Sequence, residues 1–237
     1  FVKENISKYQ LNIDITSKAL KNKMIEVITT LKFEDKQTNE KKSYYEINFA
    51  TSGSVTTFGD IPTNASCRSM NAIQTQTRGF FCGGEGTYKS PSVQNRKITE
   101  ITFATKGSAI TFGELSGESK SGASMESHTR AVVVLGGNAT SPEAFKDTIE
   151  YFTMATRGNT TDFGNATSNV GGINDNAATN TIRGVYHNAK TSDGGSNKNI
   201  LEYVTIASTG NATDFGDLTS TRNSGCGLSD THGGLHE

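Results

Sequence analysis

The chain repeats itself four times, and this repetition restricts it to folds built from copies of one small unit. The four copies align without gaps as INFATSGSVTTFGD (47–60), ITFATKGSAITFGE (101–114), FTMATRGNTTDFGN (152–165) and VTIASTGNATDFGD (204–217). Their central glycines are Gly53, Gly107, Gly158 and Gly210, spaced 54, 51 and 52 residues apart. A fixed period of this length is typical of repeat architectures such as propellers.

Each copy predicts two strands joined by a turn. Apolar and polar residues alternate before the glycine, which is the period of a strand with one buried face. A second strand carries a Phe-Gly pair. The aromatic residues are Phe58, Phe112, Phe163 and Phe215, and the glycines that follow them are Gly59, Gly113, Gly164 and Gly216. We expect each Phe to be a buried anchor and each glycine to mark a bulge or a close backbone approach.

Two further pieces recur along the chain. An arginine followed by a short apolar run begins at Arg78, Arg130 and Arg183, and predicts a third, fully buried strand. We expect these arginines to make an ion pair or to bind a backbone carbonyl in a neighbouring unit; the alternative is a ring that binds an anionic ligand. A small polar piece after each Phe-Gly could form a fourth strand.

The predicted fold is therefore all-β, a propeller of about four to five blades with roughly 52 residues per repeat. Units are expected near 43–76, 77–128, 129–181 and 182–230, with a partial unit at 231–237. Residues 1–42 are more highly charged and match the repeat poorly, which predicts divergent N-terminal strands or part of a first blade. We expect strands from both ends of the chain to close the ring, because closure removes exposed sheet edges.

Composition excludes several classes of function. The net charge is −1, which gives no basic surface for nucleic acid, and no apolar run is long enough to enter a membrane. The three cysteines form no CxxC pair, and His232 and His236 lie in a glycine-rich context, so we expect no metal and no cofactor. Asp162-Phe163-Gly164 spells a kinase tripeptide, but the nucleotide loop and catalytic loop are absent, so we expect no catalysis. The start at Phe1 suggests an upstream part of the polypeptide.

The Arg-Gly-apolar-apolar-x-Gly-Gly order around Arg78 is similar to kelch repeats, although the chain has no tryptophan. The stretches Leu201–Leu218 and Ile149–Gly164 resemble repeats of virion structural proteins from marine and other environmental bacteriophages. That resemblance covers about residues 44–237. It implies a virion location, and a tail, fibre or capsid-decoration role with other virion proteins or a host-surface receptor as partners.

Loops that differ between the units indicate how such a protein would bind. Glu85–Lys97, Asn138–Asp147 and Ala189–Lys198 occupy the same place in successive units, so we expect them to project from one rim. The leading hypothesis is a non-enzymatic structural or adhesion protein that is part of a larger assembly. The alternative is a secreted or cell-surface carbohydrate-binding propeller, a lectin, with a glycan as its ligand and an extracellular location.

Overall fold

The computed structural model describes residues 43–46, 54–60, 69–84, 96–138, 144–171, 177–192 and 195–231. Within these ranges the chain is all-β: fourteen antiparallel strands form four sheets, and there is no helix. The all-β prediction is confirmed. The strands predicted in residues 1–42, and Gly53 of the first turn, lie outside the described residues.

The sheets follow one another along the chain, each with its strands paired in chain order. The first described sheet contains β1 (Ser43–Glu46) and β2 (Thr56–Asp60). The second contains β3 (Asn71–Gln74), β4 (Arg78–Cys82), β5 (Lys97–Thr102) and β6 (Ile110–Glu114). The third contains β7 (Ala123–Glu126), β8 (Arg130–Val134), β9 (Lys146–Thr153) and β10 (Thr161–Val170). The last contains β11 (Ala177–Thr179), β12 (Arg183–Asn188), β13 (Lys198–Thr205) and β14 (Thr213–Arg222).

Every predicted piece of the repeat has a fixed place in these sheets. In the three four-stranded sheets the first strand lies within the small polar piece at β7 and at or just after its end at β3 and β11. The arginine begins the second strand, the alternating stretch is on the third, and Phe-Gly lies on the fourth. The register is also repeated, since Arg78 is opposite Thr102, Arg130 opposite Thr153 and Arg183 opposite Thr205. The same residue types therefore occupy the same pairing positions in each sheet.

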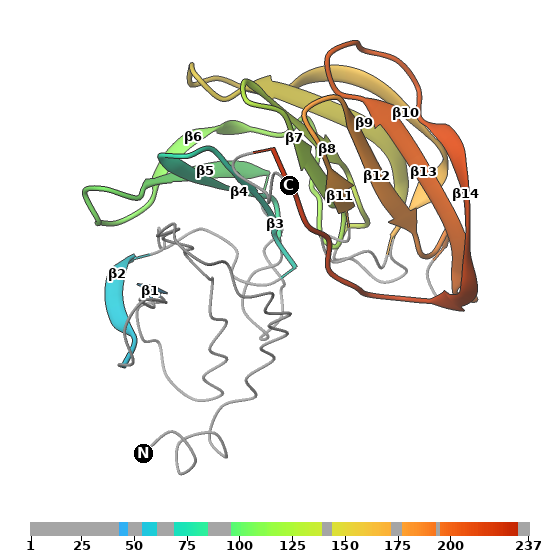
Figure 1. Cartoon of the computed structure of the whole chain (residues 1–237), viewed down its shortest axis with the longest axis horizontal. Helices are drawn as coiled ribbons and strands as arrows, with labels where there is room; N and C mark the ends of the chain where they lie inside the picture. The colour runs from blue at the N-terminus through green and yellow to red at the C-terminus, as the bar shows by residue number, and fades with distance from the viewer. Residues whose placement is uncertain are drawn as a thin grey trace.

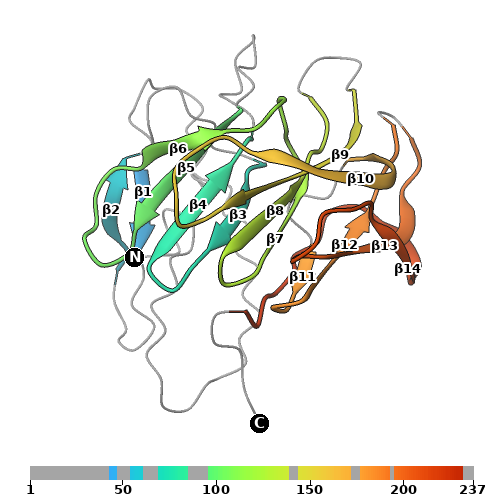
Figure 2. The same cartoon turned by 90° about the horizontal axis from the view of Figure 1, so that it is seen from above.

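The sheets are arranged side by side along an arc (Figure 1), with the first strands β3, β7 and β11 on its inner side. These inner strands contact one another in order, β3 with β7 and β7 with β11. The view from above shows the first described sheet and the last sheet at opposite ends of the arc (Figure 2). The described sheets form an open arc.

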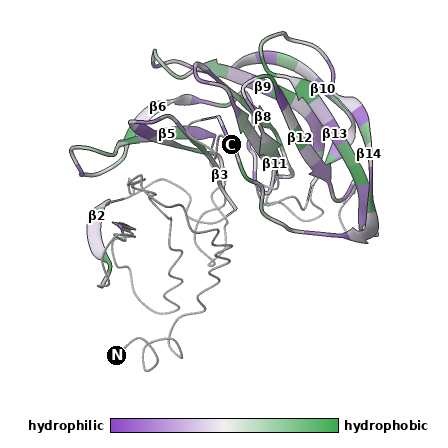
Figure 3. Ribbon diagram, viewed as in Figure 1, coloured by the Kyte–Doolittle hydropathy of each residue, from purple (hydrophilic) through white to green (hydrophobic). Residues whose placement is uncertain are grey.

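The hydrophobic core lies between consecutive sheets, because each strand presents alternate residues to each neighbour. Figure 3 shows the resulting mixture of apolar and polar residues along the strands. Between the second and third sheets, the Phe80 and Phe112 rings pack edge to face with centroids 5.0 Å apart. The ring centroid of Phe152, on the third sheet, lies 5.2 Å from the ring centroid of Phe112. No single sheet buries both of its faces by itself.

The prediction that all four Phe-Gly aromatics are buried is wrong for the last one. Phe58, Phe112 and Phe163 are 4%, 3% and 2% exposed, but Phe215 is 51% exposed. Each of the first three is covered by the sheet that follows it, and no described sheet follows β14. The Phe of the same motif is thus buried between sheets inside the arc and exposed on the last sheet.

The Phe-Gly glycines are needed for close backbone approach. A Cβ added to Gly59, Gly113 or Gly164 would overlap the carbonyl oxygen of Gly107, Gly158 or Gly210, the turn glycine of the following sheet. Gly216 has no atom of a described residue at that position. Consecutive sheets therefore meet backbone to backbone at this point, and the last sheet has no such contact with any described residue.

This contact predicts that Gly113→Ala destabilises the protein by about 1–3 kcal/mol, as overpacking of a tight site does. The matched control is Gly158→Ala on the other side of the same contact, where a Cβ meets open space and the backbone is outside the left-handed region. Urea unfolding measures both free energies. Equal losses in the two variants would show that the contact between the sheets is not the cause.

After β14 the chain returns to the inner side of the arc. Ser229 forms a parallel bridge with Thr179 on β11, and the Thr231 hydroxyl donates to the Glu126 carbonyl of β7. Ser69, Ser121 and Ser224 share a left-handed backbone, with φ of 53°, 54° and 57°. The first two lie two residues before the first residue of the inner strands β3 and β7. Residues 225–230 therefore lie where the inner strand of a further unit would begin.

Candidate interaction site

Consecutive sheets are joined by a set of backbone contacts that recurs three times and that we call the turn joint. It consists of the Gly-Ser or Gly-Asn turn of one sheet and the Phe-Gly strand of the sheet before it. Between the second and third sheets, the Gly158 N–H donates to the Phe112 carbonyl at 3.1 Å. The Glu114 N–H donates to the Asn159 side chain at 3.1 Å, and the Thr160 N–H donates to the Glu114 carbonyl at 3.0 Å.

The other two turn joints use the same atoms. In the first joint Gly107 N–H donates to the Phe58 carbonyl at 2.9 Å, and in the third Gly210 N–H donates to the Phe163 carbonyl at 2.7 Å. The side-chain acceptors are Ser108 Oγ in the first joint and Asn211 Oδ1 in the third. Ser and Asn both place an oxygen near the turn backbone, which explains why either residue type can follow the glycine.

The repeated arginines form a second connection between sheets. Arg130 on β8 donates to the Ile206 and Ala207 carbonyls of the next sheet at 3.0 and 2.9 Å, and its guanidinium lies 4.4 Å from the Tyr151 ring centroid. Arg78 on β4 donates to the Met154 carbonyl, which occupies the same repeat position as Ile206. Arg78 and Arg130 therefore both bind a backbone carbonyl of the next unit, which is one of the roles predicted for the arginines.

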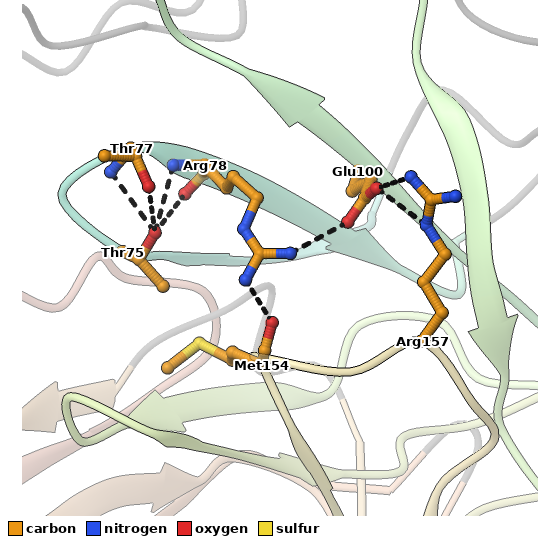
Figure 4. A network of polar contacts seen from close by, with 6 residues as sticks. All are labelled: Thr75, Thr77, Arg78, Glu100, Met154 and Arg157. Carbon is orange, nitrogen blue, oxygen red and sulfur yellow. Dashed lines mark hydrogen bonds and ion pairs between the residues drawn. The ribbon is translucent and has the colours of Figure 1, made fainter.

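Around Arg78 the connection includes a carboxylate (Figure 4). Arg78 Nη1 lies 3.3 Å from Glu100 Oε2 on the adjacent strand β5, and Arg157 of the next sheet donates from Nε to Glu100 Oε1 at 2.9 Å. The Glu100 side chain is 5% exposed, so two guanidinium groups balance a buried negative charge. Thr75 shapes the turn before β4 by accepting from the Arg78 N–H at 3.0 Å.

A column of buried glutamates was not recognised in the sequence. Glu150 on β9 accepts from the Ser116 N–H at 3.1 Å, and Glu202 on β13 accepts from the Thr167 N–H at 3.1 Å. Each carboxylate thus binds the sheet that precedes its own. Burial, reinforced by the neighbouring Glu202 carboxylate, raises the pKa of Tyr186, which keeps its hydroxyl protonated as a donor to Glu202. The signal available in the sequence was the Glu-Tyr pair at 150–151 and at 202–203.

The outward face of the last sheet carries the same groups without partners among the described residues, and we call it the open face. It consists of Arg183, Phe215, Gly216, Asp217 and Leu228. The Arg183 guanidinium lies 4.3 Å from the Tyr203 ring centroid, as Arg130 does over Tyr151, but it is exposed and binds no carbonyl of the described chain. Phe215 and Leu228 are 51% and 77% exposed and line a shallow hollow with Arg183. The arrangement fits protein binding.

The variable loops also have a common position. They connect the second and third strands of the sheets: β4 to β5, β8 to β9, and β12 to β13. Within the described residues no group of three or more His, Cys, Asp or Glu side chains could hold a metal ion. No helix in the described part of the chain is long and apolar enough to cross a membrane.

Comparison with known proteins supports the fold. No protein-family model matches the chain. The solved structure of YjhT aligns with a TM-score of 0.63 over 80% of this chain and 64% of that chain, at 10% identity, so the likeness concerns the fold alone. A putative protein-export protein SecB from Pelagibacter ubique (strain HTCC1062) is 53% identical over 51 residues. That match covers 22% of this chain and 36% of the relative, and its length is that of one repeat unit.

Proposed function

We propose that this chain is a non-enzymatic structural or adhesion protein of a bacteriophage virion, in a tail, fibre or capsid decoration. Its sheets act as the blades of a kelch-like propeller scaffold. The observation that carries this proposal is the open face, where the last sheet presents the groups that join every earlier pair of sheets. A face whose joining groups lack partners among the described residues is suited to assembly with another protein.

The variable loops supply a second surface for the same role. Three connections at equivalent places in a uniform scaffold can change in sequence without disturbing the turn joints or the arginine contacts. Loops held by a rigid framework are common sites of recognition. We therefore assign assembly to the open face and host-surface binding to the loop rim.

Virions carrying altered copies of the protein test this division of roles. In one variant the parts of these loops that lie outside the strands, 85–96, 138–145 and 189–197, are replaced by short Gly-Ser turns, while every strand remains unchanged. We expect mass spectrometry of purified virions to find the variant at the parental level, and host attachment to be lost. Virions that carry the parental protein are the control, and the parental protein must be found in them.

The proposal is wrong if the parental protein is absent from purified virions. If the loop variant is incorporated and attachment is unchanged, the adhesion role is wrong and the structural role remains. Incorporation and attachment are measured separately for this reason.

A further inference from the structure

We propose that charge at two repeat positions decides which turn can join which sheet, and thereby sets the order of the sheets. The first position directly precedes each alternating stretch, and we call it the face position. The second directly precedes the turn glycine of the following sheet, and we call it the turn position. Across the three turn joints the face positions are Glu46, Glu100 and Tyr151, and the turn positions are Lys106, Arg157 and Thr209. Such selection within one chain goes beyond the assembly role proposed above.

The residue types at the two positions change together from joint to joint. In the first joint Lys106 Nζ forms an ion pair with Glu46, and in the second Arg157 Nε donates to Glu100 Oε1 at 2.9 Å. In the third joint both positions are uncharged, since they hold a tyrosine and a threonine. Two joints therefore place a carboxylate opposite a cation, and the third has neither charge at these positions.

The turns of the third and last sheets otherwise match closely. Residues 155–159 read ATRGN and residues 207–211 read ASTGN, so besides a Thr-to-Ser change they differ only at the turn position. Both turns make the same backbone hydrogen bonds to the Phe-Gly strand before them. These bonds cannot distinguish one turn from the other, which leaves the charge at the turn position as the feature that does.

Arg130 explains why the turn of the third joint carries no cation. Its guanidinium lies 4.4 Å from the ring centroid of Tyr151, at the face position. It also donates to the carbonyl of Ala207, two residues before Thr209. A cation that reached the face position, as Arg157 does in the second joint, would meet Arg130 with no carboxylate between them. Like charges repel strongly where protein excludes bulk water, so a cationic turn is disfavoured in this joint.

The second joint disfavours a neutral turn for the opposite reason. The buried Glu100 carboxylate pairs with both Arg78 and Arg157. A threonine at the turn position would leave the carboxylate with a single guanidinium, and removal of a partner from a buried ion pair is strongly destabilising. Charge therefore fits the Arg157 turn to the second joint and the Thr209 turn to the third. It does not separate the first joint from the second, because both have a cationic turn.

An exchange of the two turn residues tests the inference. The variant Arg157→Thr, Thr209→Arg gives each turn the residue of the other, while the composition and net charge of the chain stay unchanged. We expect its equilibrium constant of unfolding, measured with urea at low ionic strength, to exceed that of the parent at least about 10-fold, as coupling between contacting residues allows. In about 1 M NaCl the loss that comes from Thr209→Arg should shrink, because salt screens exposed charges.

Two conservative variants are the matched controls. Thr209→Gln adds a long side chain without charge, and Arg157→Lys keeps a cation of the kind that Lys106 provides in the first joint. Both should unfold with equilibrium constants within about 3-fold of the parental value, as surface changes usually do. Arg157→Thr alone should be less stable than Arg157→Lys, because it removes the charge.

Tyr151→Glu supplies the third joint with the carboxylate that the second joint has. Combined with Thr209→Arg it should cost less than the sum of the two single changes, with a coupling of at least about 10-fold in the equilibrium constant of unfolding. The inference is overturned if the exchange variant is as stable as the parent, if Thr209→Arg matches Thr209→Gln, or if this double-mutant cycle shows no coupling. Equal stability of Arg157→Thr and Arg157→Lys overturns it as well, and that pair decides the matter if Thr209→Arg does not fold.

Discussion

Phe163→Ala should lower the free energy of unfolding by about 3–5 kcal/mol, whereas Phe215→Ala should lower it by less than about 1 kcal/mol. The two residues occupy the same position in nearly identical motifs, Asp162-Phe163-Gly164 and Asp214-Phe215-Gly216. Phe163 is 2% exposed between two sheets, so its removal leaves a cavity, while Phe215 is 51% exposed. Urea unfolding of dilute protein measures both values.

The pair of variants is informative because each is the control for the other. Both remove the same ring from the fourth strand of a sheet, beside a Tyr ring on the third strand at 6.1 Å for Phe163 and 6.0 Å for Phe215. Contacts within the sheet are therefore matched, and the difference reports the covering sheet. A large loss for Phe215→Ala in dilute protein would mean that the open face is covered within a single chain.

Phe163 and Phe215 also show which features of the fold could be predicted from the sequence and which could not. The period and the alternation around Ile101 and Phe152 predicted the strands and their buried faces, because side-chain direction in a strand is a local property. The burial of Phe215 could not be predicted in this way. Whether its ring is covered depends on another sheet, and the motif is the same with or without one.

The contacts between sheets were predicted only in part. Repetition of Arg78 and Arg130 pointed to a contact between units, and the structure shows that carbonyl oxygens are the acceptors. Gly113 was expected to mark a bulge or a close approach, and the following turn is what it approaches. The acceptors and the turn lie about one to one and a half periods away in sequence. Their pairing depends on how one sheet stacks on the next, which no local pattern records.

The buried glutamates were missed for a different physical reason. A glutamate beside a tyrosine in a strand is usually exposed, since burial of a carboxylate is costly unless several donors surround it. Around Glu202 the donors come from Thr167 in the preceding sheet and from Tyr186 and Asn188 on the adjacent strand. Only the assembled sheets bring them together.

Glu202→Ala should therefore destabilise the protein by about 3–5 kcal/mol, because several buried donors would lose their acceptor. Glu202 is 0% exposed, and its carboxylate accepts from Thr167 Oγ1 at 2.7 Å, the Tyr186 hydroxyl at 2.6 Å and Asn188 Nδ2 at 3.0 Å, besides the Thr167 N–H. Each carboxylate oxygen receives two donors. Chemical unfolding at neutral pH measures the loss.

Glu202→Gln separates hydrogen bonding from packing, since the side chain keeps its size. An amide has one accepting oxygen and one donating NH₂ group, so two of the four donors would face another donor. We expect a loss of about 2–3 kcal/mol from this nearly isosteric change. Glu46→Gln is the matched control: Glu46 accepts from Thr56 at 2.9 Å and pairs with the exposed Lys106, so its loss should stay below about 1 kcal/mol. If Glu202→Gln cost no more than Glu46→Gln, the buried carboxylate would not be what holds the third and last sheets together.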